Sequence, residues 1–259
     1  MAFSQQVVLE RIVQLSNRSY GLTFQADAPF IEACRPGQFV MLSSDYFLNR
    51  PYGLLSIDRE HRQFELGIDV VGKGSYAHAH LLPGAELTVI GPLGHGFDLS
   101  GNGPLILIGG GSGIYPLLTV AEEEGRRRDL RVSLGFRHAG LAVLKDRFQA
   151  SGARVIMASD SGDLDFHGHA VAAAAECFQD ILAEATFLAC GPLLMLRAAH
   201  QLSQKWQRPC QVSFEERMAC GVGFCSGCAV PMREGLPQRC CYEGPVFDST
   251  LIDWEAYHV

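Results

Sequence analysis

Cysteine is concentrated in one short stretch near the C-terminal end of the chain. Five of the nine cysteines lie in residues 220–241. Cys220, Cys225 and Cys228 follow a C-x4-C-x2-C spacing, and the pair Cys240-Cys241 comes about a dozen residues later. Glycines interleaved with these thiols let the backbone wrap closely and point N–H groups at sulfur. The stretch is therefore predicted to fold around a metal centre.

The spacing is that of plant-type [2Fe–2S] ferredoxins, in which four thiolates hold two irons. Four thiolates also suit a structural zinc ion, but zinc sites usually pair two short CxxC knuckles and only Cys225/Cys228 forms one here. Disulfides fit least, because the cysteine count is odd and the chain does not open with a signal peptide. A [2Fe–2S] cluster carries single electrons, so the remainder of the chain is expected to supply a donor and an acceptor.

Composition narrows the class of protein further. The chain has 259 residues, 47% of them hydrophobic and 19% charged, which is ordinary for a globular protein with about two domains and a small appendage. A formal net charge of −7 gives no footprint for nucleic acid, and no apolar stretch is long enough to cross a membrane. We expect a soluble, cytoplasmic protein with neither nucleic acid nor membrane as a partner.

The pattern along the chain predicts three units. Residues 1–100 are β-rich with turn residues between strands, which predicts an antiparallel β-barrel. The strands expected there span 7–15, 19–26, 38–43, 63–71 and 86–90, with a helix over 76–81. Residues 101–210 alternate apolar strands and helices, which predicts an α/β domain whose parallel sheet is covered on both faces. Residues 211–259 form the cysteine module.

Two motifs in the barrel are candidates for cofactor binding. Arg50-Pro51-Tyr52-Gly53 follows an expected barrel strand, and its arginine could bind a phosphate while its tyrosine stacks on a planar ring. The run from Gly67 to Ser75 ends before a helix, where backbone N–H groups and a hydroxyl could meet a pyrophosphate. Taken alone, each motif is equally compatible with an ordinary turn.

Two motifs in the α/β domain are candidates for nucleotide binding. Gly109–Gly113 follows a buried strand and opens a helix, the place where parallel sheets bind dinucleotides. It reads Gly-Gly-Gly-Ser-Gly, so the usual G-x-G-x-x-G fingerprint is not met. Cys190-Gly191-Pro192 follows the last expected strand. It could instead be a simple helix start, with Cys190 as a small apolar core residue.

Together these motifs match a known family. Their order resembles the ferredoxin–NADP reductase superfamily, in which a flavin-binding barrel precedes a nicotinamide-binding α/β domain. The run from Glu216 to Cys228, and Cys241-Tyr242-Glu243-Gly244-Pro245-Val246-Phe247, closely resemble the electron-transfer subunits of class 1B dihydroorotate dehydrogenases. The resemblance covers nearly the whole chain.

The resemblance implies roles for individual residues. FAD would contact Arg50, Pro51, Tyr52, Gly53, Gly67, Ile68, Asp69, Gly74 and Ser75. NAD would contact Gly109, Gly110, Gly111, Gly113, Cys190, Gly191 and Pro192. The [2Fe–2S] cluster would be held by Cys220, Cys225, Cys228 and Cys241, since the last ligand of the family directly precedes x-[Asp/Glu]-Gly-Pro-Val-Phe. Gly53 departs from the family, which has a serine there, so a hydroxyl near the flavin ring is missing.

The resemblance also implies a partner. A separate FMN-containing catalytic subunit would oxidise dihydroorotate, in a heterotetramer of two catalytic and two electron-transfer chains, and electrons would pass through the cluster and FAD to NAD⁺. We identify no catalytic residue for dihydroorotate oxidation in this chain. Two alternatives remain: a reductase subunit of a hydrogenase or sulfite reductase complex, and a non-catalytic binding module with a zinc knuckle. Arg137-His138 would favour NADPH, whereas the resemblance favours NADH.

Overall fold

A closed barrel forms the first part of the chain in a computed structural model that describes residues 3–46 and 48–257. Its strands follow the order β1-β2-β5-β4-β3-β6 and every neighbouring pair is antiparallel. Alternate residues point inward and build a core around Phe24, Phe64 and Leu66. The elements are β1 Phe3–Gln14, β2 Ser19–Gln25, α1 Ala28–Ala33, β3 Phe39–Leu42, β4 Arg50–Asp58, β5 Gln63–Asp69, α2 Lys73–Ala79 and β6 Glu86–Leu93.

One expectation for the barrel is wrong. Arg50 does not stand in a connection after β3 but begins β4, which pairs with β3 so that Leu42 faces Arg50 and Met41 faces Pro51. Proline and glycine made this segment look like a turn. Proline is nevertheless tolerated near the start of a strand, where a missing N–H removes little of the ladder. The consequence is that Tyr52 and Gly53 stand on the rigid barrel wall and not on a loop.

A seven-stranded sheet forms the second part, with the order β10-β9-β8-β7-β11-β12-β15. All pairs from β10 to β12 are parallel, as the alternation of strands and helices predicted, and β15 is antiparallel. The elements are β7 Leu105–Gly110, η1 Gly111–Gly113, α3 Ile114–Glu124, β8 Leu130–Phe136, η2 Ala139–Leu141, α4 Lys145–Ala150, β9 Arg154–Ser159, β10 Phe166–His167, α5 Ala170–Cys177, β11 Thr186–Cys190, α6 Leu193–Lys205 and β12 Cys210–Ser213.

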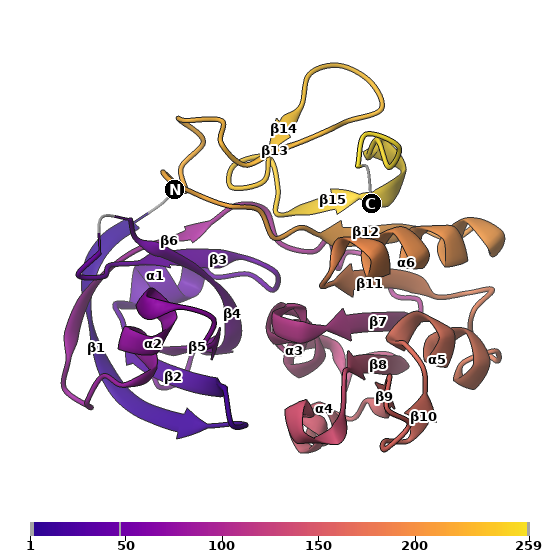
Figure 1. Ribbon diagram of the computed structural model, residues 1–259, viewed down its shortest axis with the longest axis horizontal. Helices are drawn as coiled ribbons and strands as arrows, with labels where there is room; N and C mark the ends of the chain where they lie inside the picture. Colours follow the sequence, from indigo (N-terminus) through magenta and orange to yellow (C-terminus); the bar gives the residue numbers. More distant parts are fainter. Residues whose placement is uncertain (1–2, 47, 258–259) are drawn as a thin grey trace.

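Helices cover both faces of this sheet, as predicted (Figure 1). Leu105 and Leu107 of β7 pack in one core with α3 and α4, whereas Ile106 and Ile108 pack in the other with α5 and α6. This alternation follows from the period of two along a strand. The sheet therefore has two buried faces, and the carboxyl ends of its parallel strands point toward the barrel.

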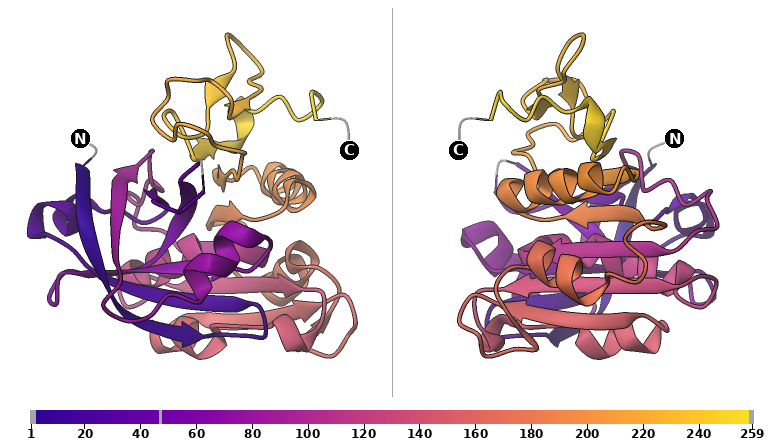
Figure 2. Two further views of the ribbon diagram at one scale, coloured as in Figure 1. Left: turned by 60° about the vertical axis from the view of Figure 1, so that its left-hand side comes forward. Right: turned by 90° about the vertical axis from the view of Figure 1, so that its right-hand side faces the viewer.

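The cysteine-rich segment lies across both parts, shown in yellow in Figures 1 and 2. Its elements are β13 Ala229–Val230, β14 Gln238–Arg239, β15 Val246–Asp248 and η3 Ser249–Leu251. β15 joins the sheet beside β12, while the N–H of His95 donates to the carbonyl of Gly244 at 2.6 Å on the barrel side. The boundaries expected after residues 100 and 210 stay predictions, and β12 spans the second of them.

Candidate functional site

The barrel and the sheet enclose a cavity of about 390 Å³, which we call the barrel cavity. Of the residues predicted to bind a flavin, five line it: Pro51, Tyr52, Gly53, Gly67 and Asp69. They come from β4 and β5, so the wall is made by neighbouring strands of a rigid barrel. Cys190 and Gly111 from the predicted nucleotide site line the opposite side. The cavity thus joins motifs that are up to about 140 residues apart in the sequence.

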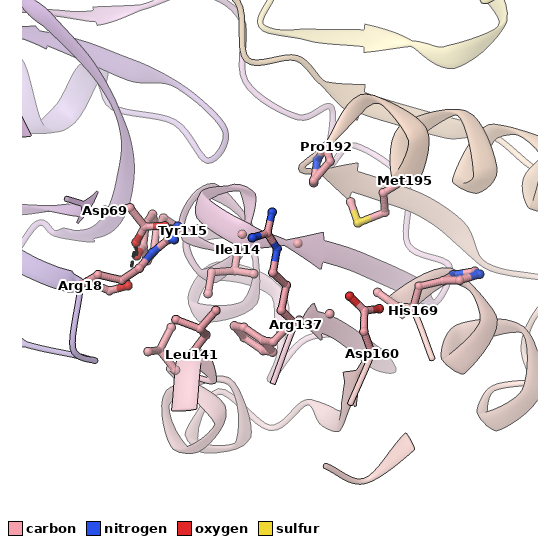
Figure 3. A pocket seen from close by; sticks show the side chains of 17 residues that line it. Arg18, Asp69, Ile114, Tyr115, Arg137, Leu141, Asp160, His169, Pro192 and Met195 are labelled. Carbon is pink, nitrogen blue, oxygen red and sulfur yellow. Dashed lines mark hydrogen bonds and ion pairs between the residues drawn. The ribbon is translucent and has the colours of Figure 1, made fainter. Parts of the chain in front are cut away.

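A second cavity of about 340 Å³, the sheet cavity, lies at the carboxyl ends of β7, β8, β9 and β11. The predicted residues Gly110, Gly111 and Pro192 line it. Arg137, which was considered for nucleotide preference, also faces it (Figure 3), as do Asp160 and His169, which the predicted site did not include. The sequence could have indicated them by position, because each one directly follows a strand or precedes a helix at the carboxyl ends of the sheet. Open α/β sheets bind nucleotides in such a crevice.

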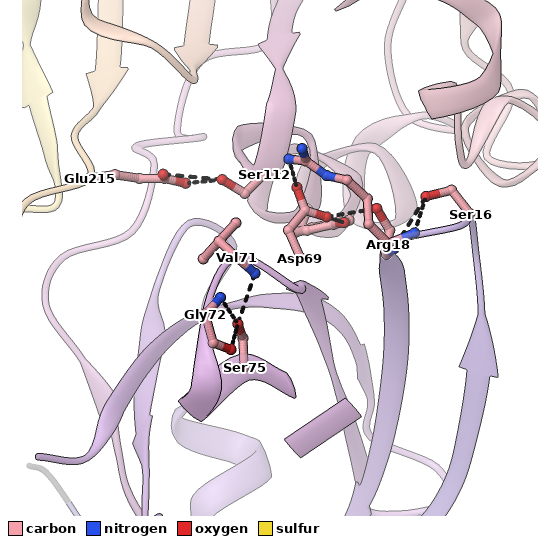
Figure 4. Close-up of polar contacts among 10 residues, drawn as sticks. Ser16, Arg18, Asp69, Val71, Gly72, Ser75, Ser112 and Glu215 are labelled. Carbon is pink, nitrogen blue, oxygen red and sulfur yellow. Dashed lines mark hydrogen bonds and ion pairs between the residues drawn. The ribbon is translucent and has the colours of Figure 1, made fainter. Parts of the chain in front are cut away.

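The two cavities share one wall, made of Arg18, Asp69, Gly111 and Tyr115. The hydroxyl of Tyr115 donates to Asp69 Oδ1 at 2.6 Å, and the Ser19 hydroxyl donates to the same oxygen at 2.7 Å. Arg18 pairs with the other oxygen at 3.2 Å (Figure 4). Burial and the Asp69 charge raise the pKa of Tyr115, so its hydroxyl stays a donor. A ligand in either cavity would therefore meet this wall.

The positions of Gly67 and Gly74 show why glycine is needed there. A β-carbon on Gly67 would overlap the Tyr115 ring, and one on Gly74 would overlap the guanidinium of Arg50. Arg50 thus lies directly over the first turn of α2. It makes no ion pair with any residue that the structure describes, and its closest charge-stabilising contact is the Tyr46 ring at 5.9 Å. An unpaired arginine at a helix start suits a phosphate group.

Not every predicted flavin contact lies at the barrel cavity. Arg50, Ile68, Gly74 and Ser75 are not among its lining residues. The Ile68 side chain is fully buried in the barrel core, so only its backbone is left for a ligand. The Ser75 hydroxyl donates to the Gly72 carbonyl at 3.1 Å and accepts from two backbone N–H groups (Figure 4), which caps α2.

Several predicted nucleotide residues support the fold at this edge. A β-carbon on Gly113 would overlap the Cys190 carbonyl, so the glycine lets α3 start against β11. Gly191 has φ of +152°, a backbone conformation that side chains rarely adopt. A β-carbon on Gly109 would lie 3.0 Å from Ile114 and Leu134. These glycines bring strands and helix close enough to shape the crevice without lining it.

Glu215 is a cavity residue that sequence reasoning missed. It follows β12, and Ser112 of η1 donates to both of its carboxylate oxygens at 3.0 and 3.1 Å (Figure 4). The Glu215 side chain lines the barrel cavity and is exposed there. Desolvation by the surrounding cavity wall raises the pKa of Glu215, while the Ser112 hydrogen bond acts in the opposite direction. Its partner is more than 100 residues away, so no local pattern could have indicated the pair.

The predicted cluster ligands are arranged as two pairs. The N–H of Cys225 points at Cys220 Sγ at 3.4 Å, and the N–H of Cys241 points at Cys228 Sγ at 3.4 Å. The N–H of Gly223 adds a contact to Cys241 Sγ at 3.1 Å. In residues 3–46 and 48–257, no three His, Cys, Asp or Glu side chains converge on a single point as metal ligands. Backbone N–H groups directed at cysteine sulfurs are the contacts that stabilise thiolate ligands of an iron–sulfur centre.

The thiols differ in their electrostatics. Burial opposes ionisation of Cys220, but the backbone N–H groups of Cys225 and Val222 outweigh it and lower the pKa of that thiol to about 6. Burial and the neighbouring Cys228 raise the pKa of Cys241 to about 12. Cys240 is fully buried, and its thiol donates to the Phe214 carbonyl at 3.2 Å.

Comparison with known proteins points the same way. Residues 215–253 match the model of the iron–sulfur cluster binding domain of dihydroorotate dehydrogenase B. The chain is 33% identical over 254 residues to the electron transfer subunit of dihydroorotate dehydrogenase B (NAD(+)) from Desulforamulus reducens, covering 94% of this chain and 96% of that one. It is 36% identical over 252 residues to the same subunit from Geobacillus thermodenitrificans, covering 93% and 94%.

Solved structures share the fold. An NADH-dependent reduced ferredoxin–NADP oxidoreductase, described for flavin-based electron bifurcation, superposes with a TM-score of 0.83 at 22% identity, covering 96% of this chain and 90% of that one. The ferredoxin reductase in carbazole 1,9a-dioxygenase gives 0.71 at 19% identity, covering 80% and 67%. The described residues contain no helix that is long and apolar enough to cross a membrane.

Proposed function

The chain belongs to the family of electron-transfer subunits of dihydroorotate dehydrogenase B, and from that premise we propose that it passes electrons from a catalytic partner through a [2Fe–2S] cluster and FAD to NAD⁺. The observation that carries the proposal is the wall shared by the two cavities. A flavin and a nicotinamide need direct contact to exchange a hydride. Arg18, Asp69 and Tyr115 border both spaces, so ligands of the two cavities would meet there.

The barrel cavity is the proposed site of the flavin. Tyr52 and Gly53 would wall the ring system, and Arg50 with the backbone at Gly74 would hold the pyrophosphate. The sheet cavity is the proposed site of NAD, with Gly110, Gly111 and Pro192 against the nucleotide at the strand ends. When bound, FAD would supply two-electron exchange with the nicotinamide and one-electron exchange with an iron–sulfur cluster.

The cysteine pairs are the proposed cluster ligands, Cys220 with Cys225 and Cys228 with Cys241. Their backbone N–H donors would stabilise negative charge on the sulfurs, which is how second-shell contacts tune such centres. The loop also lies against the barrel, because a β-carbon on Gly221 would lie 2.5 Å from Met41 Cγ. β3, which carries Met41, is paired with the strand that carries Tyr52. This contact supports a short route between cluster and flavin.

The protein groups at the shared wall would orient the ligands and handle protons. Asp69 accepts hydrogen bonds from Tyr115 and Ser19 and pairs with Arg18, so its charge is balanced and the wall is held in one geometry. Glu215 lines the barrel cavity and accepts a hydrogen bond from Ser112, so it would stand beside the flavin as a polar group held in place.

The proposed partner is a catalytic subunit that oxidises dihydroorotate. The family name implies a catalytic subunit, and we infer that this subunit contains FMN and forms a heterotetramer of two catalytic and two electron-transfer chains. Phe224 supports a docking surface at the cluster loop, because its side chain is 91% exposed. The family membership favours this partner over one of the hydrogenase or sulfite reductase type. A cytoplasmic location stays a prediction from the sequence.

The decisive experiment separates the two halves of electron transfer. The purified chain should oxidise NADH with ferricyanide as acceptor, because flavin and nicotinamide would share one polypeptide. It should not oxidise dihydroorotate until the catalytic subunit is added. In the complex, loss of the cluster should suppress dihydroorotate-dependent NAD⁺ reduction far more than NADH–ferricyanide activity. A cluster-free complex that couples the two reactions at the normal rate would exclude the proposed route.

A further inference from the structure

His78 of α2 connects three segments of the flavin site. Its side chain is 2% exposed, although histidine is usually found nearer the surface. Nε2 lies 2.9 Å from the backbone carbonyl oxygen of Ser43, just after β3, and Nδ1 lies 2.9 Å from the hydroxyl oxygen of Tyr52 in β4. The His78 ring meets the Tyr52 ring edge-on, with centroids 5.5 Å apart and an interplanar angle of 71°.

The partners fix which nitrogen of His78 carries the proton. A carbonyl oxygen can only accept, so Nε2 must be the N–H that donates to Ser43. In the neutral imidazole, Nδ1 is then left with a lone pair and must accept. Tyr52 therefore donates its only hydroxyl proton to Nδ1. The direction of both hydrogen bonds follows from the single contact with the backbone of Ser43.

We propose that His78 is a positioning residue, which holds the Tyr52 ring as a wall of the flavin cavity by accepting the tyrosine's hydroxyl proton. This inference rests on the proposed function, because it takes the barrel cavity as the flavin site. Tyr52 lines that cavity and His78 does not, so His78 acts through Tyr52.

The position of His78 in α2 gives the contact a second effect. The first turn of α2 lies against Arg50 through Gly74, and the last turn carries His78. Tyr52 and Arg50 stand two residues apart on β4. The helix α2 thus contacts β4 at two points of the proposed site. His78 contacts Tyr52 at the aromatic wall, and Gly74 contacts Arg50 at the phosphate end. Restricting both before the ligand arrives lowers the entropy that binding must overcome.

The charged groups around His78 favour its neutral form. Burial lowers the pKa of His78, and the nearby Arg50 acts in the same direction, while Ser43 and Asp45 oppose them. If the ring took up a proton, Nδ1 would become a donor and the Tyr52 hydroxyl would have to reverse. The accepting state of Nδ1 is therefore the one that the surroundings maintain.

Two amide substitutions separate the roles of the two nitrogens. The side-chain oxygen of asparagine can take the place of Nδ1, and the side-chain NH2 of glutamine can reach the place of Nε2. H78N should keep an acceptor for Tyr52, and H78Q should keep only the donor to Ser43. We expect H78N to bind FAD within about threefold of wild type and H78Q about tenfold more weakly, the effect of one buried hydrogen bond. FAD affinity of the apoprotein is measured by quenching of flavin fluorescence.

Tyr52→Phe removes the hydroxyl that His78 accepts from, so it is the protein in which H78Q is tested a second time. It should weaken FAD binding about as much as H78Q, and H78Q should cost nothing further when added to it. This arm tests the inference even if H78Q alone does not fold, which the melting curve would show. Equal losses in H78N and H78Q, or Tyr52→Phe protein with wild-type affinity, would overturn the role of His78. Failure of the wild-type apoprotein to bind FAD would instead overturn the proposed function.

Discussion

Pro116 of α3 occupies the space that a side chain on Gly53 of β4 would need. A β-carbon added to Gly53 would lie 2.7 Å from Cγ of Pro116, and real β-carbons essentially never come so close to another heavy atom. The proline ring is rigid and cannot move aside as a long side chain would. This contact between barrel and sheet leaves little room for a side chain at position 53, where the resemblance implied a serine.

The first prediction follows from this contact. Gly53→Ser should lower the free energy of unfolding by about 1–3 kcal/mol, the usual cost of overpacking. In a Pro116→Ala background the same change should cost less than about 1 kcal/mol, because the blocking ring atoms are gone. Urea unfolding of the four proteins measures the coupling. Additive costs would show that the two residues do not compete for space.

The second prediction concerns the two adjacent cysteines. Cys241→Ser should deplete the cluster, because Cys241 is paired with Cys228 and receives the Gly223 N–H. Cys240→Ser should leave about two irons per chain, since that thiol donates to the Phe214 carbonyl. Iron content and the visible spectrum give the answer. If both variants lost iron alike, the assignment of the fourth ligand would be wrong.

The third prediction tests the phosphate end of the flavin site. Arg50→Ala should weaken FAD binding by about 1.5–3 kcal/mol, the range for a hydrogen bond to a charged group. Arg50→Lys should recover part of the loss, because it keeps the charge but not the planar fork. Arg11→Ala, an exposed arginine on β1, is the control and should bind FAD normally. Retention of full FAD by Arg50→Ala after gel filtration and dilution would make Arg50 a structural residue only.

The fourth prediction concerns docking. Phe224→Glu should weaken association with the catalytic subunit at least tenfold, because a charge would replace an apolar contact on the cluster loop. NADH–ferricyanide activity should be unchanged, since Phe224 lines neither cavity. Leu82→Glu is the matched control, because Leu82 is 77% exposed but lies after α2 in the barrel. Association of each variant with the catalytic subunit is measured by titration followed with light scattering. Equal weakening by the two variants would argue against a specific surface at Phe224.

The fifth prediction is a pH dependence. The unfolded chain protonates His78 near pH 6.5, about the free value, whereas burial keeps the folded pKa lower. The unfolded state therefore binds more protons, and the stability that His78 contributes above pH 6.5 is lost as the pH falls through the folded pKa. His78→Asn cannot titrate, so its deficit relative to wild type should shrink on acidification.

His61→Asn gives the opposite sign and serves as the control. His61 is exposed, and its contact with Asp58 raises its pKa. Its stabilising contribution is present below pH 6.5 and lost as the pH rises, so the deficit of this variant should grow on acidification. Urea unfolding between about pH 5 and 8 measures both differences. A deficit of His78→Asn that grows at low pH would show that His78 is charged in the folded protein.

Local patterns were enough for most strands and helices and for most motifs, but they did not indicate β4 or α1. The apolar strand over residues 105–108, the glycines after it and the alternation beyond predicted a parallel sheet with a crevice at Gly110 and Gly111, and both glycines line the sheet cavity. The wrong element was the segment at Arg50, because a proline and a glycine near a strand start produce the same pattern as a turn.

The sequence by itself determined the chemistry that the chain can perform. This chemistry resides in local features: the cysteine spacing, the arginine and tyrosine of β4, and the glycines at strand ends. Each of these can be recognised from a few neighbouring residues. Tertiary structure alone decided the contacts between them. Tyr115 meets Asp69 across 46 residues, Ser112 meets Glu215 across 103, and His78 meets Tyr52 across two elements. Such pairs form only when the chain has packed into its tertiary fold, because polar groups brought together there need partners that no period in the sequence specifies.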